Sequence, residues 1–312
     1  MIISASRRTD IPAFYSDWFM NQIENGKIYR KNPYNNELYS NDISPDNVDV
    51  IVFWTRNAHN MIRKGHIQRL QDLGYNFYFQ YTITGHVIKS PSGKNLDGNT
   101  PHPLKAIETF NQLSNIIGEE KVILRFDPIV VCDQISVEKV IKNYDEINKR
   151  INSGSRVVIS FLDIYNHVGA YLNKAGFTGM KDLVKPENES DLTKLLEGLS
   201  NVNKEYGKEM FSCAESIDLE KYGIQHSKCI DDQYIQKVFG IKVSKQKDKG
   251  QREACGCVKS LDIGQYDTCT HGCVYCYATP NHEEAIKNLS KHSKHNGLII
   301  PDERTWLNQR II

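Results

Sequence analysis

Short runs of apolar, β-branched and aromatic residues alternate with helix-like segments along most of this chain. Strands are expected at residues 1–6, 48–55, 77–83, 121–131, 156–163, 209–215 and 260–267. Several of these runs are apolar nearly throughout, which is typical of parallel strands covered on both faces. Helices are expected at residues 16–26, 57–74, 103–118, 136–152, 189–207 and 281–292. This alternation over 312 residues predicts an α/β protein and favours a TIM-like (βα)8 or partial barrel over a doubly wound sheet.

The composition is that of an ordinary globular protein. Hydrophobic residues make up 39%, charged residues 25%, and the net charge of +1 argues neither for nor against a polyanionic partner. Apolar runs are too short to span a bilayer, and the first residues lack the long apolar core of a signal peptide. We therefore expect a cytoplasmic protein without a membrane partner.

Six of the eight cysteines lie from residue 229 onwards, and three form a C-x3-C-x2-C array, Cys269, Cys273 and Cys276. In a reducing compartment, closely spaced thiols more often bind metal or carry out redox chemistry than form disulfides. Thiolates select iron–sulfur clusters, zinc or copper(I). Three thiolates on one loop can hold three irons of a cluster and leave the fourth open. A zinc site completed by His271 is the alternative.

The array "CTHGCVYC", residues 269–276, resembles the signature of the radical S-adenosylmethionine superfamily, including the aromatic residue before the third cysteine. The resemblance implies that Cys269, Cys273 and Cys276 ligate a 4Fe–4S cluster, with S-adenosylmethionine on the fourth iron and Tyr275 near its adenine. It implies an enzyme that generates a 5′-deoxyadenosyl radical and takes its electron from a donor such as flavodoxin or ferredoxin. The substrate is unknown, and a lyase, an isomerase and a transferase are not distinguished.

The position of the array departs from that superfamily, where it normally follows the first barrel strand. "CVYCYA" is similar to the start of the spore photoproduct lyase-like branch, and later landmarks of that branch appear to come first here, in "ISASRRTDIP", "VIVFWTRN", "YFQYTITG" and "ILRFDPIV". This order implies a circular permutation, which a barrel tolerates because its first and last strands are neighbours. Residues 1–240 would supply barrel strands and helices. Residues 241–312 would supply a basic connector and the cluster-binding strand, loop and helix that complete the same barrel. The whole chain also resembles an uncharacterised bacterial family with a C-terminal cysteine cluster.

Four further cysteines could form a second site. Cys213, Cys229, Cys255 and Cys257 together supply enough thiolates for a second 4Fe–4S cluster or a structural zinc. Alternatively, Cys213 is a buried small hydrophobe, which is a common fate of free cysteine. Cys132, alone after an apolar strand, is expected to pack in the core.

Polar residues follow several expected strands, where a barrel of this kind forms its active site. The catalytic candidates are Arg7, Asp10, Arg125, Asp127 and Glu215, and the other strand-end residues are Ser4, Arg8, Thr55, Arg56, Thr82, Thr84, His86 and Asp163. Arg125 and Asp127 alternate on one strand and should point to the same side. They are interpreted either as a structural ion pair or as site residues.

Two other classes of protein fit parts of the sequence. The basic run at residues 242–252, close to a cysteine cluster, would suit a zinc-stabilised nucleic-acid-binding module. The array would also suit an iron–sulfur redox protein that never cleaves S-adenosylmethionine. Metal content and the response of a cluster to S-adenosylmethionine distinguish these alternatives.

Overall fold

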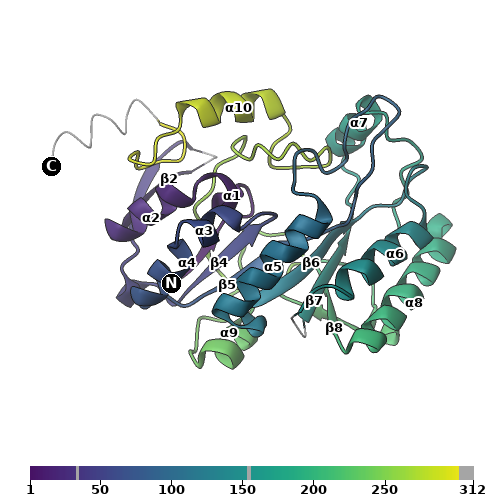
Figure 1. Ribbon diagram of the computed structural model, residues 1–312, viewed down its shortest axis with the longest axis horizontal. Coiled ribbons are helices and arrows are strands. Elements are labelled where there is room, and N and C mark those ends of the chain that lie inside the picture. Colours follow the sequence, from purple (N-terminus) through teal and green to yellow (C-terminus); the bar gives the residue numbers. More distant parts are fainter. Residues whose placement is uncertain (33–34, 153–155, 302–312) are drawn as a thin grey trace. The chain divides into compact units, whose positions relative to one another are not determined.

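A computed structural model describes residues 1–32, 35–152 and 156–301 of the protein. The described residues form an α/β fold with a parallel sheet (Figure 1), which confirms the expected class. The strand order is β10-β1-β4-β5-β6-β7-β8-β9. These strands are β1 (Ile2–Ala5), β4 (Val50–Thr55), β5 (Phe77–Thr82), β6 (Val122–Ile129), β7 (Arg156–Phe161), β8 (Glu209–Cys213), β9 (Ile224–Ser227) and β10 (Leu261–Asp262).

Helices follow most of these strands. They are α1 (Ile11–Phe14), α2 (Ser16–Glu24), α3 (His59–Arg63), α4 (His66–Asp72), α5 (Pro103–Ile117), α6 (Val137–Asn148), α7 (Asn166–Lys174), α8 (Glu189–Tyr206), α9 (Asp232–Phe239) and α10 (His282–Lys291). A separate antiparallel hairpin consists of β2 (Lys27–Lys31) and β3 (Leu38–Asp42). In the described parts of the chain, no helix is both long and apolar enough to cross a membrane.

The chain divides into two compact units. The first comprises residues 1–78, residues 260–272 and the chain from residue 277 onwards. The second comprises residues 79–259 and residues 273–276. The boundary therefore passes through the cysteine array, so that Cys269 belongs to the first unit and Cys273 and Cys276 to the second.

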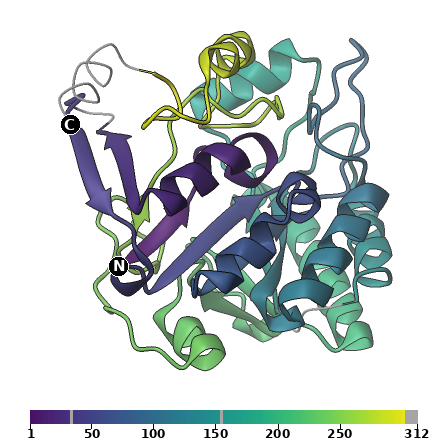
Figure 2. The same cartoon turned by 60° about the vertical axis from the view of Figure 1, so that its left-hand side comes forward.

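The first unit places β10, β1 and β4 side by side in parallel. Ile3 of β1 is opposite Leu261 on one side and Ile51 on the other. The expected neighbourhood of the N-terminal strand and the strand before the array is thus observed, although β10 is much shorter than residues 260–267. Figure 2 shows β1 and β4 with the short helices that follow them. Phe19 of α2 meets Phe53 of β4 edge to face, with ring centroids 5.3 Å apart, and both rings are buried.

The second unit contains the parallel neighbours β6, β7, β8 and β9. Helices α6 and α8 lie against each other (Figure 1). Their close approach depends on Gly198 of α8, because a Cβ atom there would lie 2.3 Å from Cδ1 of Ile141. The buried hydroxyl of Tyr144 on α6 adds a hydrogen bond to Asn203 of α8 at 2.5 Å. A small residue and one polar contact therefore fix this helix pair.

One expected helix is two. The pattern of residues 57–74 predicts a single helix, but the structure has α3 and α4 separated at Gly65. Gly65 has φ of +72°, a left-handed conformation that only glycine adopts readily, and it ends one helix before the other begins. The hairpin β2–β3, β9, α7 and α9 were not expected from the sequence.

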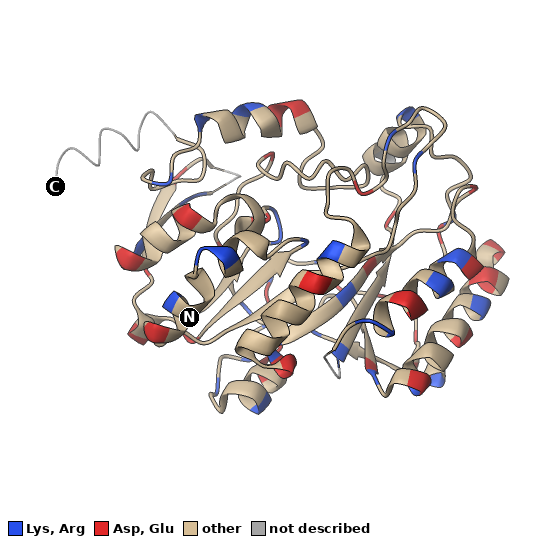
Figure 3. Cartoon of the chain, viewed as in Figure 1, with Lys and Arg blue, Asp and Glu red and all other residues tan. Residues whose placement is uncertain are grey.

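Charge on the exposed helices follows the helix dipole. Asn281 caps α10 by accepting a hydrogen bond from the Glu284 backbone at 3.1 Å, and Glu283 and Glu284 occupy the first turn. Lys291 lies in the last turn, so acidic and basic residues mark opposite ends of this helix (Figure 3). Both placements stabilise a helix that directly follows the array.

Candidate functional site

The loop that enters the cysteine array lies in the first unit and is fixed by the segment after β1. The Thr9 hydroxyl lies 2.7 Å from the Thr268 hydroxyl and donates to the Gln265 carbonyl at 3.0 Å. The Tyr15 hydroxyl donates to the Thr268 carbonyl at 2.7 Å. Burial raises the pKa of Tyr15, and the charge of a Cys269 thiolate raises it further, so this phenol stays a neutral donor. The backbone immediately before Cys269 is therefore well positioned.

Asp10 and His271 form a buried pair that ties the array to the same segment. The carboxylate of Asp10 lies 2.8 Å from Nε2 of His271, and both residues are buried. It also accepts hydrogen bonds from the Thr55 hydroxyl at 2.7 Å and from the backbone of Arg56 at 2.8 Å and Ala13 at 3.0 Å. Because both of its oxygens take part in these contacts, Asp10 holds the loop in position.

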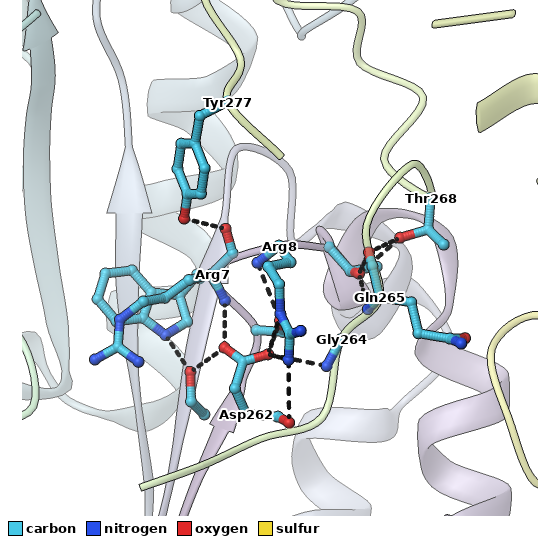
Figure 4. A network of polar contacts seen from close by, with 11 residues as sticks. Arg7, Arg8, Asp262, Gly264, Gln265, Thr268 and Tyr277 are labelled. Atoms are coloured by element: carbon cyan, nitrogen blue, oxygen red, sulfur yellow. Dashed lines mark hydrogen bonds and ion pairs between the residues drawn. The ribbon is translucent and has the colours of Figure 1, made fainter. Parts of the chain in front are cut away.

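Asp262, the last residue of β10, collects a second set of donors (Figure 4). They are the hydroxyls of Ser4 at 3.0 Å and Ser6 at 2.5 Å, the guanidinium of Arg8 at 3.0 Å, and the backbone of Arg7 at 3.0 Å and Gly264 at 3.0 Å. Burial acts to raise the pKa of Asp262, but the Arg8 charge and the hydrogen bonds outweigh burial and hold the pKa below its usual value. The turn after β1 and the turn after β10 are thereby joined through one carboxylate.

The predicted candidate Arg7 takes part through its backbone and its ring contact. Its guanidinium lies over the ring of Trp54, 4.9 Å from the centroid. Its carbonyl accepts a hydrogen bond at 3.2 Å from the hydroxyl of Tyr277, the residue after the array's last cysteine (Figure 4). Trp54 itself donates to the Ser4 hydroxyl at 3.1 Å. Arg7 thus belongs to the network that surrounds the array within the first unit.

The other part of the array lies in the second unit, where it contacts the long loop that follows β5. The backbone of Val274 donates to the Leu96 carbonyl at 3.0 Å. The Cys273 thiol lies 3.5 Å from the Asp97 carbonyl, and the backbone of Cys276 returns to the Cys273 carbonyl at 3.1 Å. The structure shows that this loop seats the array.

Tyr275 is anchored by a buried carboxylate. Its hydroxyl donates to Asp97, whose other oxygen accepts from the Thr84 hydroxyl at 2.5 Å. Nδ1 of His86 lies 3.6 Å from Asp97, and within the described residues neither nitrogen of this buried ring has a hydrogen-bond partner. The structure therefore brings the predicted residues Thr84, His86 and Tyr275 together around Asp97, which the sequence reasoning did not single out.

Three side chains in and next to the array are buried. Thr268, His271 and Tyr275 are buried and carry the contacts just described. The side chains of Cys269, Cys273 and Cys276 form no disulfide and are partly exposed, as are those of Thr270 and Val274. Three buried side chains thus hold the loop in place, and three soft donors stay partly accessible.

The remaining thiols of interest are gathered inside the second unit. Cys213 ends β8 and Cys229 follows β9, and their Sγ atoms are 2.7 Å apart. The Cys257 thiol contacts the thiols of both Cys229 and Cys255, so that the four sulfurs form a continuous chain. All four side chains are buried, and we call them the buried thiol group. The hydrogen bond from Cys229 lowers the pKa of Cys213; burial opposes this effect and the Arg125 charge adds to it.

Arg125 and Asp127 of β6 lie beside the buried thiol group. As their alternation predicts, they point to the same side and form an ion pair, with Nε of Arg125 3.0 Å from Asp127. Nη1 of Arg125 donates to Sγ of Cys229 at 2.8 Å, and Asp127 accepts from the Ser160 hydroxyl. The ion pair therefore adjoins a thiol cluster that was not foreseen as its neighbour.

Glu215 is the remaining predicted site residue. One carboxylate oxygen accepts a hydrogen bond from the Phe161 backbone at 2.9 Å. Burial, with a smaller contribution from the charge of Asp163, raises the pKa of Glu215 to about 7. Asp163 forms an ion pair with Arg252 at the end of the basic run. These residues lie at the carboxyl ends of β7 and β8.

The His, Cys, Asp and Glu side chains of the described residues are not preassembled around a metal position. Within residues 1–32, 35–152 and 156–301, no three His, Cys, Asp or Glu side chains are already gathered around a point as a metal ion would require. At the array, the ligand-type side chains are three partly exposed thiols and His271, whose Nε2 is bound to Asp10 and whose buried Nδ1 has no hydrogen-bond partner among the described residues. A carboxylate on one ring nitrogen is a common support for a histidine that binds metal through the other, so the geometry leaves both a cluster and a zinc site open.

The chain was compared with known proteins. A family model described as a domain of unknown function (DUF1848) matches residues 2–278, which is nearly the whole chain. No curated protein matches the chain. The family match assigns no activity.

Proposed function

The chain belongs to the DUF1848 family, and we propose that it is a radical S-adenosylmethionine enzyme. Cys269, Cys273 and Cys276 would ligate three irons of a 4Fe–4S cluster. The observation that carries the proposal is that buried, hydrogen-bonded Thr268, His271 and Tyr275 anchor the array while its three cysteines are partly exposed. A loop built in this way offers three thiolates and leaves room for a small molecule at the fourth iron.

When bound, the cluster would supply one electron, received from a donor such as flavodoxin or ferredoxin, for cleavage of S-adenosylmethionine to methionine and a hydrogen-abstracting 5′-deoxyadenosyl radical. The residues of this chain hold the array in place. Thr9 and Tyr15 fix the backbone before Cys269. Asp10 orients His271, and Asp97 holds Tyr275. Each contact is buried, so the loop keeps its conformation without water as a partner.

The fold proposed with this function is a circularly permuted (βα) barrel. The parallel pairing of β1 with β10 supports it, because the strand before the array takes its place beside the N-terminal strand. The strand order of the described residues has two ends, β10 and β9. A partial barrel of this order would keep the array at the carboxyl end of β10, the end at which such enzymes carry their sites.

The proposal is tested by purifying the protein without oxygen, reconstituting it with iron and sulfide, and incubating it with dithionite and S-adenosylmethionine. We expect about four irons per chain at the array and formation of 5′-deoxyadenosine. Replacing Cys269, Cys273 and Cys276 with serine should abolish both. The matched control is Cys132→Ser, because Cys132 is buried and lies outside both thiol groups.

Three results would overturn the proposal. Zinc in place of iron at the array would favour a zinc-stabilised nucleic-acid-binding module, whose exposed basic residues would be those of the run 242–252. An iron–sulfur cluster that yields no 5′-deoxyadenosine would favour a redox protein. Equal iron in the triple variant and the Cys132→Ser control would remove the array as the ligand set.

A further inference from the structure

The buried thiol group joins parts of the second unit that are far apart in sequence. Cys213 is the last residue of β8, and Cys229 lies in the turn after β9. Cys255 and Cys257 come from a segment without regular secondary structure. A single buried cysteine is commonly a small hydrophobe. Four thiols brought into one chain of sulfur contacts are not explained by packing alone, since any small apolar residue would fill the same space.

Two of these sulfurs accept N–H donors, as metal-bound thiolates commonly do. Nη1 of Arg125 donates to Sγ of Cys229 at 2.8 Å, and the backbone of Ile230 donates to Sγ of Cys257 at 3.4 Å. Arg125 is itself buried, and its charge is shared with Asp127. N–H donors directed at sulfur and a buried cation nearby offset the negative charge that several thiolates around one metal would carry.

The segment that carries Cys255 and Cys257 has little regular secondary structure to hold it in place. Residues 241–259 contain no helix and only an isolated bridge between Lys247 and Val258. Its contacts with the rest of the second unit include the backbone hydrogen bond from Val258 to the Ile230 carbonyl at 3.0 Å and the exposed ion pair of Arg252 with Asp163. Four thiolates on one ion would join it to the ends of β8 and β9 and replace several weak contacts by coordination bonds.

From these contacts we infer that Cys213, Cys229, Cys255 and Cys257 form a closed four-thiolate site for a single thiophilic metal ion, of which zinc is the closest match. A closed set of four cysteines is a common structural zinc arrangement. A cubane cluster needs its four ligands on four different irons and so spreads them more widely than this chain of adjacent sulfurs. The site is independent of the cluster proposed at the array.

Binding requires a small rearrangement. Two thiolates on one tetrahedral zinc are about 3.8 Å apart, given zinc–sulfur bonds of about 2.3 Å. The Sγ atoms of Cys213 and Cys229 are 2.7 Å apart. Rotation of these side chains about χ1 would turn the chain of contacts into a cage. The four residues need no change of secondary structure, since each lies at an end of a strand or in an irregular segment.

The test uses the full chain purified without oxygen from medium supplied with zinc and iron, with both metals measured per chain. We expect about one zinc that remains when Cys269, Cys273 and Cys276 are all serine. Cys255→Ser should lose that zinc and keep the iron of the array, whereas Cys132→Ser should keep both. The zinc-loaded protein should also melt several degrees higher than the same protein stripped with a chelator, as expected for a structural metal.

The experiment remains decisive if Cys255→Ser folds poorly, because the chelator measurement uses the unaltered chain. If the variant with serine at Cys269, Cys273 and Cys276 loses the zinc and Cys255→Ser keeps it, the inference is overturned. A chain that takes up no zinc and melts at the same temperature with and without chelator would also overturn it. About four irons in place of one zinc at these cysteines would overturn the single-ion assignment, and a disulfide between Cys213 and Cys229 in the anaerobic protein would overturn the metal site.

Discussion

The two groups of cysteines in this chain are built in opposite ways. In the array, the thiols are partly exposed, and two residues between them, His271 and Tyr275, are buried and hydrogen-bonded. In the buried thiol group, the thiols themselves are inside, and Arg125 is directed at one of them. The first arrangement suits a metal centre with an open coordination position, and the second suits a centre closed to solvent. Both the number of donors, three against four, and their burial separate the two proposed roles.

The supporting contacts differ as well. The array is held by carboxylates that accept several donors each, namely Asp10 and Asp97 around the loop and Asp262 at its entrance. In the buried thiol group, Cys213 and Cys229 lie at strand ends, Cys255 and Cys257 lie in an irregular segment, and their approach depends on the packing of the second unit. Charged hydrogen bonds allow an accessible loop to be rigid, because they supply positional order that apolar burial cannot provide there.

The largest expected difference is chemical reactivity. In the metal-free protein, a thiol alkylating reagent should modify Cys269, Cys273 and Cys276 roughly 100-fold faster than the buried cysteines, because the latter react only when the structure opens. Mass spectrometry of the labelled peptides over time measures each site. Cys132, which is buried in a different place, provides the reference for a protected thiol. Equal rates at the array and at the buried thiol group would break the comparison.

A smaller effect is expected where the array begins. Asp262→Asn removes the charge that binds Arg8 and should cost about 3 kcal/mol of unfolding free energy, since it leaves a part-buried guanidinium without its counter-ion. Urea unfolding at neutral pH measures this loss. The exposed Asp46→Asn is the matched control and should change little.

The same variant predicts a change in pH dependence. Because the folded-state pKa of Asp262 lies below the unfolded value of about 3.9, its stabilisation is fully present above that pH and is lost as the pH falls through the folded-state value. The unaltered protein should therefore lose more stability between neutral pH and pH 3 than Asp262→Asn does. Parallel loss in both proteins would show that Asp262 carries no charge-dependent stabilisation.

The smallest effect compares two neighbouring tyrosines. Tyr275→Phe removes the donor to buried Asp97 and should cost about 1 kcal/mol. Tyr277→Phe removes a hydrogen bond from a side chain that is 52% exposed and should cost close to nothing. Comparing the urea unfolding midpoints of the two variants measures the contribution of the buried Tyr275–Asp97 hydrogen bond. If both variants lose the same stability, Asp97 does not anchor the array.

Much of the fold could be predicted because its strands are local signals. Continuous apolar runs identified β4, β5, β6 and β7 to within a few residues, since buried parallel strands leave such a pattern. The hairpin β2–β3 carries lysine, arginine and asparagine in place of apolar residues, so its sequence resembles a loop. The break at Gly65 was missed because the apolar spacing continues across it.

The candidate site could be predicted only in part. The array and the alternation of Arg125 and Asp127 are visible in the sequence because each depends on residues a few positions apart. Asp97 and Asp262 were missed because their roles depend on partners far along the chain, Tyr275 for one and the turn after β1 for the other. The convergence of Cys255 and Cys257 with Cys229 likewise depends on how an irregular segment packs. Tertiary placement leaves no local pattern of this kind.

The central claim is that the array holds a cluster with one open iron. The most direct measurement is the paramagnetic resonance spectrum of the anaerobic, dithionite-reduced protein recorded with and without S-adenosylmethionine. The account predicts a reduced 4Fe–4S signal that changes when S-adenosylmethionine is added and that is missing from the variant with serine at Cys269, Cys273 and Cys276. A signal that is unaffected by S-adenosylmethionine, or that persists in this variant, would contradict the account.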